Sequence, residues 1–333
     1  MFGVAAKDLA VDLGTANTLI CCRGRGIVLN EPSVIAVRLQ GKRKTPLAYG
    51  AEAKAMVGRT PEGVSVLRPV KAGVIADFEA ASLMLNHFLK TAARPRSIFK
   101  PRIVVGVPNG VTEVEKRAIR DSIEGGAAVR LIDQSMAAAI GAGLAVTEPT
   151  ASMIVDIGGG TTDVAVISMG QIVCAQSLRQ GGDAMDEAIM NWMRRHHQFL
   201  IGESSAEVIK RTIGAAHPRF DGDEMEVRGR SVTKGAPATT TVSAGELREA
   251  MSEVVTAIIA TVRHALEITP AELAGDVMST GVVLSGGGAL LRGLDLRLRE
   301  ELEIDIRLAE DPISAVVVGA GRCLEREFRG VLM

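Results

Sequence analysis

DLAVDLGTANTLICC (residues 8–22) and SMIVDIGGGTTDVAVIS (residues 152–168) share one plan, and together they decide the fold of this 333-residue chain. Each segment has an apolar strand that contains an Asp, a turn rich in Gly and Thr, and a second apolar strand. Alternating apolar residues are typical of β-strands, so each segment predicts a β-hairpin with a polar turn. Because the hairpin occurs twice, about half a chain apart, the sequence predicts two similar halves that face each other.

The turns of both hairpins have the chemistry of a phosphate site. Glycines let backbone N–H groups approach an oxyanion without interference from a Cβ atom, and Thr and Asn side chains add donors. The carboxylates of Asp12 and Asp156, one at each strand end, suit Mg²⁺ held directly or through its waters. A single Gly-rich hairpin turn is usually only a turn. Two matching copies favour a shared phosphate site.

A third glycine cluster, LSGGGAL (residues 284–290), stands where a predicted strand turns into a predicted helix. A helix N-terminus offers free N–H groups and the positive end of the dipole, which favours anions. Alone, this cluster is equally compatible with a plain strand–helix turn. Other phosphate motifs are absent from the sequence: there is no GxxxxGK[ST], and Leu291 and Val146 stand where two candidate GxGxxG motifs need their last glycine.

The rest of the chain alternates between helical and strand patterns, which predicts an α/β fold with a mixed sheet and helical layers. Thr112 and Glu115 have the spacing of a capping box at the start of one of these helices. Strands are expected at 27–37, 102–107, 130–133, 171–178 and 281–284, a β insertion at 220–243, and helices at 78–90, 111–123, 135–145, 183–200, 206–213, 244–267, 289–300 and 312–328.

Composition narrows the functional class. Lys plus Arg number 38 and Asp plus Glu 39, so the near-neutral chain lacks the basic excess of a nucleic-acid binder. The four cysteines form no CxxC pair, which favours buried thiols in a reducing cytosol over metal or disulfide use. No apolar run approaches the roughly 20 residues of a membrane-spanning helix, and the N-terminus is too short for a signal peptide. We therefore expect a cytoplasmic protein that does not bind nucleic acid.

The three glycine segments together resemble the actin/Hsp70/sugar-kinase superfamily. The stretches DLGTANTLI, GIVLNEPSV, GVIADF, VDIGGGTT and SGGGALLRGL, with the segments at 182–189 and 201–210, are similar to signatures of the MreB family in the same order. The resemblance implies an actin-like fold: two related RNase H-like domains flank a nucleotide cleft, and each has a small subdomain insertion. Domain I would comprise residues 1–150 plus 309–333 with an insertion at about 32–72, and domain II residues 151–308 with an insertion at about 186–242.

The resemblance also implies a site for ATP or ADP with Mg²⁺. Asp12 and Asp156 would organise the metal ion, and Glu207 and Lys210 would reach the ribose and adenine. Without the resemblance, Glu207 and Lys210 would be interpreted as an ordinary helix ion pair. The cofactor-binding set is Gly14, Thr15, Ala16, Asn17, Gly158, Gly159, Gly160, Thr161, Gly182, Glu207, Lys210, Gly286, Gly287, Gly288, Ala289 and Leu290, and the catalytic set is Gln134, Asp12, Asp156 and Thr162.

The sequence departs from the family pattern at three positions. Gln134 and Ser135 replace the Glu-Pro that usually precedes Met-Ala-Ala-Ala, and Ala72 replaces a frequent Asp. The family Glu is thought to align the attacking water; Gln can orient water but cannot accept its proton, and some NTPases use Gln for this task. We therefore expect that ATP hydrolysis is retained but altered relative to the family pattern, and that it is slow and coupled to filament assembly. The alternative is a filament locked in one nucleotide state.

Two apolar pairs suit a membrane surface. Met1 and Phe2 lie at the N-terminus, and Ile98 and Phe99 lie among basic residues, a pattern that fits anionic lipid. A buried loop anchor is the alternative for the second pair. The resemblance implies paired homopolymeric protofilaments at the inner face of the cytoplasmic membrane, which contact membrane proteins of cell-wall synthesis and organise cell shape. A specialised filament or scaffold with weak hydrolysis stays open. Two other functional classes fit the sequence less well. A small-molecule kinase would need a catalytic Asp on the acceptor side, and the sequence offers no convincing candidate. A chaperone-type ATPase would need a peptide-binding domain, which we do not expect here.

Overall fold

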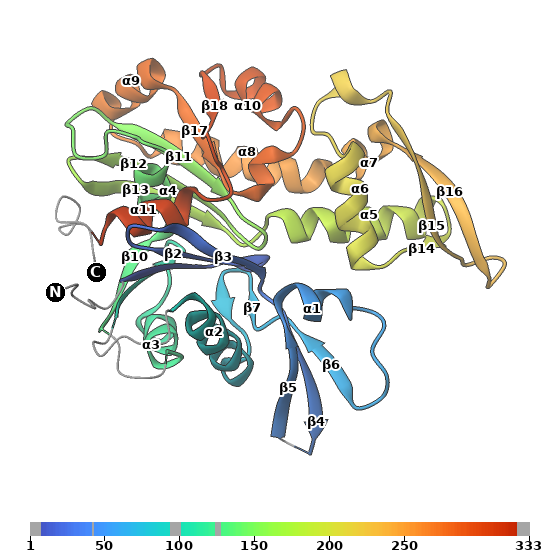
Figure 1. Ribbon diagram of the computed structural model, residues 1–333. Helices are drawn as coiled ribbons and strands as arrows, with labels where there is room; N and C mark the ends of the chain where they lie inside the picture. The colour runs from blue at the N-terminus through green and yellow to red at the C-terminus, as the bar shows by residue number, and fades with distance from the viewer. Residues whose placement is uncertain (1–7, 42, 94–100, 124–127, 325–333) are drawn as a thin grey trace.

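The computed structural model describes residues 8–41, 43–93, 101–123 and 128–324. It confirms the α/β class and both predicted hairpins (Figure 1). In the first hairpin, β1 (Leu9–Leu13) pairs antiparallel with β2 (Asn17–Cys22). In the second, β11 (Ser152–Ile157) pairs antiparallel with β12 (Thr162–Ser168). The two Gly-rich turns therefore occupy equivalent places in the two halves of the chain.

Each hairpin belongs to a five-stranded sheet, and the two sheets have the same strand order. In both sheets, the hairpin and the strand after it form three antiparallel strands. Two further strands then run parallel to the first strand of the hairpin. This topology confirms that the two halves are similar. The first sheet is β3 (Gly26–Pro32), β2, β1, β9 (Arg102–Val107) and β10 (Ala128–Asp133); the second is β13 (Gln171–Leu178), β12, β11, β17 (Val282–Ser285) and β18 (Ile306–Leu308).

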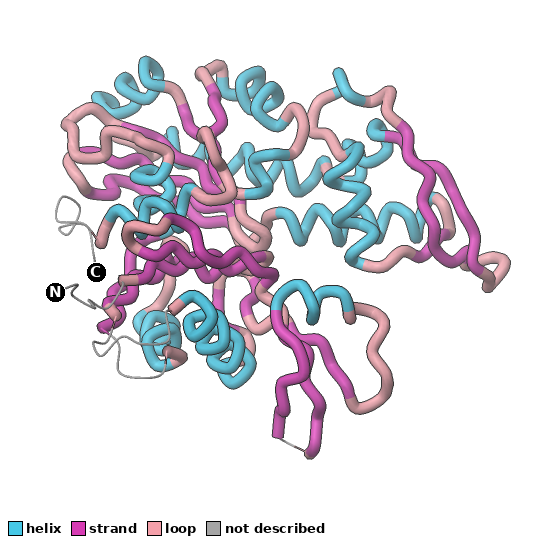
Figure 2. The backbone as a smooth tube through the Cα atoms, in the orientation of Figure 1, coloured by secondary structure: helices cyan, strands magenta, loops and turns pink. Residues whose placement is uncertain are grey.

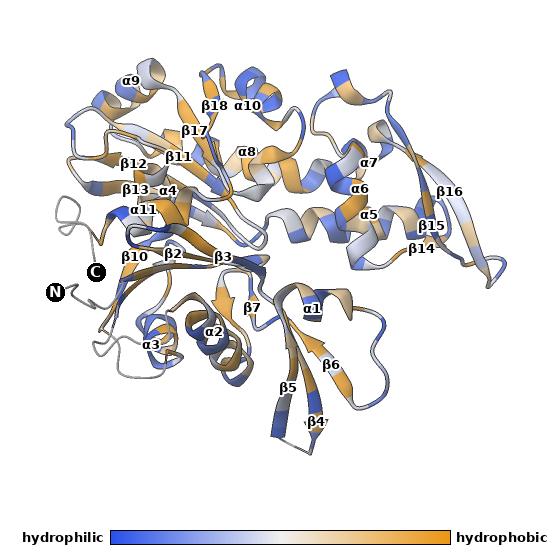
Figure 3. Ribbon diagram, viewed as in Figure 1, coloured by the Kyte–Doolittle hydropathy of each residue, from blue (hydrophilic) through white to orange (hydrophobic). Residues whose placement is uncertain are grey.

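The first strand of each hairpin is buried on both faces. Along β1, Leu9 and Val11 pack into an outer core with α2 (Phe78–Ala92), whereas Ala10 between them faces an inner core. Along β11, Val155 joins the outer core and Ile154 the inner one. This alternation is what a pleated strand buried on both faces requires. In Figure 3 the strands of both sheets are accordingly mostly apolar.

The inner core is filled by two helices, α4 (Gln134–Gly141) and α11 (Ala315–Arg322), which lie between the sheets (Figure 2). They pack with almost no separation: a Cβ on Gly141 would lie 1.8 Å from the carbonyl oxygen of Ala315, and one on Gly319 would lie 1.8 Å from that of Ala137. Only glycine permits this contact. As α11 also packs on β1, β2 and β9, the C-terminal helix returns to the first sheet.

Smaller elements project from the two halves on one side of the molecule (Figure 1). The first half carries the sheet β5–β4–β6 with α1, and the second carries β14–β15–β16. The remaining bounds are β4 (Ile35–Gln40), β5 (Arg43–Tyr49), α1 (Gly50–Ala55), β6 (Val64–Leu67), β7 (Val70–Lys71), β8 (Val74–Ile75), α3 (Glu113–Asp121), α5 (Gly182–His196), β14 (Phe199–Leu200), α6 (Glu203–Ile213), η1 (Pro218–Phe220), β15 (Glu224–Ser231), β16 (Pro237–Ser243), α7 (Ala244–Ala250), α8 (Ser252–Glu267), α9 (Ala271–Thr280), η2 (Gly287–Leu290) and α10 (Leu294–Leu302).

The structure corrects several predicted boundaries. The helix predicted over 183–200 ends at His196, and residues 199–200 form strand β14. The single helix predicted over 244–267 is two helices that meet at Met251. The helix predicted to begin at Ala289 is instead the short 3-10 helix η2, and α10 begins only at Leu294. The interpretation of the third glycine cluster as an α-helix N-terminus was therefore wrong. The predicted capping box of Thr112 and Glu115 is confirmed.

Over the part of the chain that the structure describes, no helix combines the length and the hydropathy needed to cross a bilayer.

Candidate functional site

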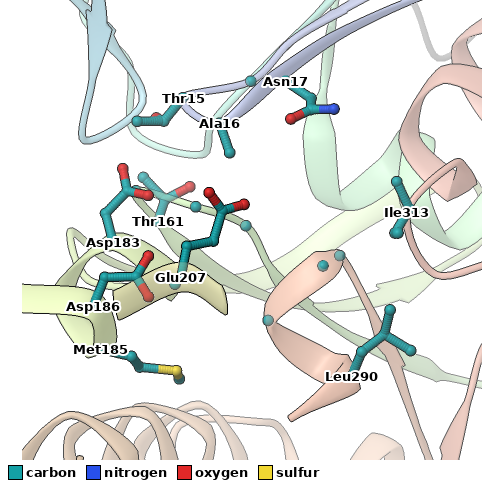
Figure 4. A pocket seen from close by; sticks show the side chains of 18 of the residues that line it. Thr15, Ala16, Asn17, Thr161, Asp183, Met185, Asp186, Glu207, Leu290 and Ile313 are labelled. Atoms are coloured by element: carbon teal, nitrogen blue, oxygen red, sulfur yellow. The ribbon is translucent and has the colours of Figure 1, made fainter. Parts of the chain in front are cut away.

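A cavity of about 600 Å³ lies where the two hairpin turns face each other (Figure 4). Thr15, Ala16 and Asn17 line it from the first half, and Thr161 lines it from the second. Most residues of the predicted site line this one cavity. They are Asp12, Gly14, Thr15, Ala16, Asn17, Gln134, Asp156, Gly158, Gly159, Gly160, Thr161, Gly182, Glu207, Lys210, Gly286, Gly287, Gly288 and Leu290.

The two hairpin turns touch each other, and glycine makes the contact possible. A Cβ on Gly159 would lie 2.8 Å from Cβ of Ala16, and one on Gly160 would lie 2.6 Å from Oγ1 of Thr15. Both distances are shorter than any ordinary contact of a Cβ atom. The second turn therefore presents bare backbone to the first, so N–H groups of both turns border the same space.

The turn between β7 and β8 lies beside both hairpins. The backbone N–H of Gly73 donates to Oγ1 of Thr15 at 3.2 Å, and a Cβ on Gly73 would lie 2.8 Å from Cγ2 of Thr161. Ala72 and Gly73 both have positive φ, +47° and +76°. Two consecutive residues with positive φ are typical of a type I′ turn, which prefers Asn or Asp at its first central position. The departure at Ala72 thus falls on a strained backbone position that contacts the site.

Two buried carboxylates lie in the cavity wall. Burial raises the pKa of Asp12 to about 6, although Nε2 of Gln134 donates to its Oδ1 at 3.0 Å and opposes the rise. Burial, with smaller contributions from the charges of Asp12 and Asp163, raises the pKa of Asp156 to about 7, against a hydrogen bond of 2.7 Å from Oγ of Ser285. A cation between the two carboxylates would offset the cost of burying their charge.

This pair of carboxylates fits Mg²⁺ better than a metal held by protein alone. Within the described residues no group of three or more His, Cys, Asp and Glu side chains is arranged to hold a metal ion. Mg²⁺ commonly takes only one or two carboxylates and completes its shell with waters and substrate phosphates. Asp12 and Asp156, beside two phosphate-type turns, match that donor set.

Glu207 and Lys210 both line the cavity from α6, but they do not form the simple helix pair that their spacing allows. Glu207 pairs with Lys54 of α1 at 2.5 Å. Lys210 pairs with Asp186 at 2.9 Å and donates to the carbonyl of Gly182 at 2.7 Å. Lys54 comes from the first half of the chain and Glu207 from the second, so this ion pair joins the two halves at the cavity wall.

Several wall residues were not found from the sequence alone. Asp183 and Asp186 lie in the first turns of α5, and burial raises the pKa of Asp186 to about 6. Their acidity at the start of a predicted helix was the available signal. Leu290 and Ile313, both about half exposed, form an apolar side of the cavity opposite Glu207 (Figure 4). No sequence pattern marked Ile313, because its place depends on how the segment before α11 packs.

Not every predicted residue lines the cavity. Thr162 is fully buried, and its hydroxyl donates to the carbonyl of Gln180 at 2.9 Å. Ala289 is also buried and absent from the wall. The four residues predicted to contact a membrane, Met1, Phe2, Ile98 and Phe99, lie outside the described residues.

Known proteins resemble this chain over nearly its whole length. The family model of the MreB/Mbl protein matches residues 6–329. The chain is 52% identical to the cell shape-determining protein MreB of Escherichia coli K12, over 97% of this chain and 94% of that protein, and 46% identical to Mbl of Bacillus subtilis 168, over 96% of each. The crystal structure of ADP-bound MreB5 of Spiroplasma citri superposes with a TM-score of 0.91 at 33% identity, over 99% of both chains. The chain has an actin-like fold and belongs to the MreB/Mbl family.

Proposed function

We propose that this protein binds ATP or ADP in the cavity between its two halves and assembles into filaments that help to determine cell shape. The observation that carries the proposal is the contact between the two glycine turns across one cavity. A nucleotide bound there would join the two halves. MreB5 of Spiroplasma citri was crystallised with ADP and with AMPPNP, and the relatives from E. coli and B. subtilis are named for cell shape. Both facts support the proposal.

The phosphates would lie on the hairpin turns, and the nucleoside would lie toward Leu290 and Ile313. Backbone N–H groups around Ala16 and Gly159 would bind the phosphate oxygens. Asp12 and Asp156 would hold Mg²⁺, which when bound supplies positive charge to the phosphate oxygens. The apolar side of the cavity would contact the base, and Glu207 would reach the ribose on release from Lys54.

Gln134 would orient the attacking water. Its side chain lines the cavity, and the hydrogen bond from Nε2 to Asp12 fixes the amide plane. The carbonyl oxygen of the same amide can accept a hydrogen bond from water but cannot take its proton in the way a carboxylate would. Phosphoryl transfer depends mainly on positioning and electrostatics, so we infer slow hydrolysis coupled to assembly.

We also propose that the filament acts at the inner face of the cytoplasmic membrane, next to membrane proteins of cell-wall synthesis. The sequence supports this idea through Ile98 and Phe99 and the basic residues around them. One such patch binds weakly, but a polymer multiplies its effect. The double change Ile98→Ser, Phe99→Ser is expected to abolish co-sedimentation with anionic vesicles and to leave polymerisation intact; unchanged co-sedimentation would reject the patch.

Sedimentation and electron microscopy of the purified protein test the proposed function. With Mg²⁺ and ATP we expect filaments in the pellet, with fewer or shorter filaments without nucleotide, and phosphate release measured in the same tubes. Bound ATP without any polymer at high protein concentration would contradict the filament proposal. Phosphate release at the level of a no-protein control would instead favour the nucleotide-locked alternative.

A further inference from the structure

Arg292 joins two segments that line the cavity. It follows the glycine cluster Gly286–Gly288 and η2, and its side chain lines the cavity itself. From there the guanidinium reaches the C-terminal end of α6, the helix that carries Glu207 and Lys210. No other wall residue described above connects these two segments through its side chain.

The guanidinium satisfies the end of α6. Nη2 donates to the carbonyl of Ile213 at 2.7 Å, and Nε donates to the carbonyl of Gly214 at 3.3 Å. The last four carbonyls of a helix have no partner within the helix, and a cation beside them is also favoured by the helix dipole. Arg292 therefore acts as a C-terminal cap supplied by a distant segment.

Further contacts hold the guanidinium in this position. Nη1 pairs with Oδ2 of Asp223 at 2.6 Å, and the guanidinium lies 5.3 Å from the ring centroid of Phe220. The backbone of Arg292 is fixed separately, because its carbonyl accepts a hydrogen bond from the N–H of Ala216 at 2.8 Å. All three guanidinium nitrogens are thus engaged, a geometry that a lysine ammonium cannot reproduce.

We propose that Arg292 is a positioning residue for the nucleoside end of the bound nucleotide. It sets the separation between α6 and the glycine cluster, the two segments that would enclose ribose and base. Among the described residues, its hydrogen bonds and ion pair all lie outside the phosphate turns. The inference rests on the proposed nucleotide site and assigns separate roles within it. The hairpin turns bind the phosphates, and Arg292 holds the segments around the nucleoside in position.

The test compares two ligands in the presence of Mg²⁺: ATP, which uses both halves of the site, and inorganic tripolyphosphate, which uses only the hairpin turns. Arg292→Ala is expected to weaken ATP binding roughly tenfold, in the range that changes within a connected network produce. Tripolyphosphate binding should stay unchanged. Arg292→Lys should fall between the wild type and Arg292→Ala, because it keeps the charge but loses the fork of donors.

Arg248 provides a matched control. It forms a bidentate pair with Asp221 at 2.8 Å, its side chain is 32% exposed against 34% for Arg292, and it lies outside the cavity wall. Arg248→Ala should change neither affinity. If the wild type binds ATP, two results would overturn the inference about Arg292: unchanged ATP affinity in Arg292→Ala, or an equal loss of affinity for ATP and tripolyphosphate. A wild type that binds tripolyphosphate as tightly as ATP would also overturn it, and a wild type that binds neither would refute the proposed function itself.

Discussion

The contact between α4 and α11 makes a strong prediction about stability. Gly319→Ala would place a Cβ 1.8 Å from the carbonyl oxygen of Ala137, where ordinary contact begins at 3.4 Å. The obstacle is helix backbone, so relief requires the two helices to move apart by more than 1 Å. These helices fill the core between the two sheets, and α4 begins with Gln134.

The size of the effect follows from two opposing contributions. Alanine is favoured over glycine inside a helix by about 1 kcal/mol. Overpacking a tight core costs about 1–3 kcal/mol and more when the backbone must shift. We expect a net loss of about 2 kcal/mol, which for a chain of this size lowers Tm by roughly 3 °C.

Gly275→Ala is the matched control for this substitution. Gly275 also lies within a helix, α9, and a Cβ there would meet nothing within 4 Å. This change should therefore stabilise the protein by about 1 kcal/mol, the helix-propensity gain alone. Thermal melts monitored by circular dichroism compare the two variants under one set of conditions. A Tm for Gly319→Ala equal to or above that of the wild type would refute the reasoning about the helix contact.

Three further predictions follow from the site. Ala72→Gly removes a side chain from a residue with a φ of +47° and should raise stability by about 0.5–1 kcal/mol in thermal melts, and a lower Tm would contradict the strain. Without Mg²⁺ and nucleotide, Tm should fall from about pH 5 to about pH 8, because the raised pKa values of Asp12 and Asp156, about 6 and about 7, make the folded state hold more protons than the unfolded one there. Asp156→Asn should flatten that slope, and a slope that stays the same would refute the assignment. Arg68 and Glu203 both line the cavity and form an ion pair of 2.6 Å, which Arg68→Glu would replace with a repulsion. This change should speed ATP dissociation a few-fold, with recovery on adding Glu203→Arg; no recovery would contradict a direct pairing.

The sequence predicted local features well where the chemistry was repeated or short-range. Both hairpins and the capping box of Thr112 and Glu115 could be predicted from residue patterns alone. Most residues predicted for the site also meet in one cavity. The site could be predicted because the hairpin is repeated, since a single Gly-rich hairpin would have been interpreted as an ordinary turn.

The sequence failed where tertiary packing overrides a local pattern. Residues 199–200 continue an apolar helical period, yet they pair with β15 as strand β14. Ala289 begins a helical pattern, but close packing of Gly286 and Gly288 on Ile157 confines the segment to a 3-10 turn. The pairing of Glu207 with Lys54 and the role of Arg292 depend on segments far apart in the chain, which no local pattern reports.

The central claim is that the two hairpins are the halves of a single nucleotide site, and calorimetric titration with ATP and Mg²⁺ tests it most directly. The wild type should bind one ATP per chain. Asp12→Asn in the first hairpin and Asp156→Asn in the second preserve shape and remove charge, and each alone should weaken that one binding event by about tenfold or more. Two binding events per chain, or an affinity that either substitution leaves unchanged, would contradict a site shared between the two halves.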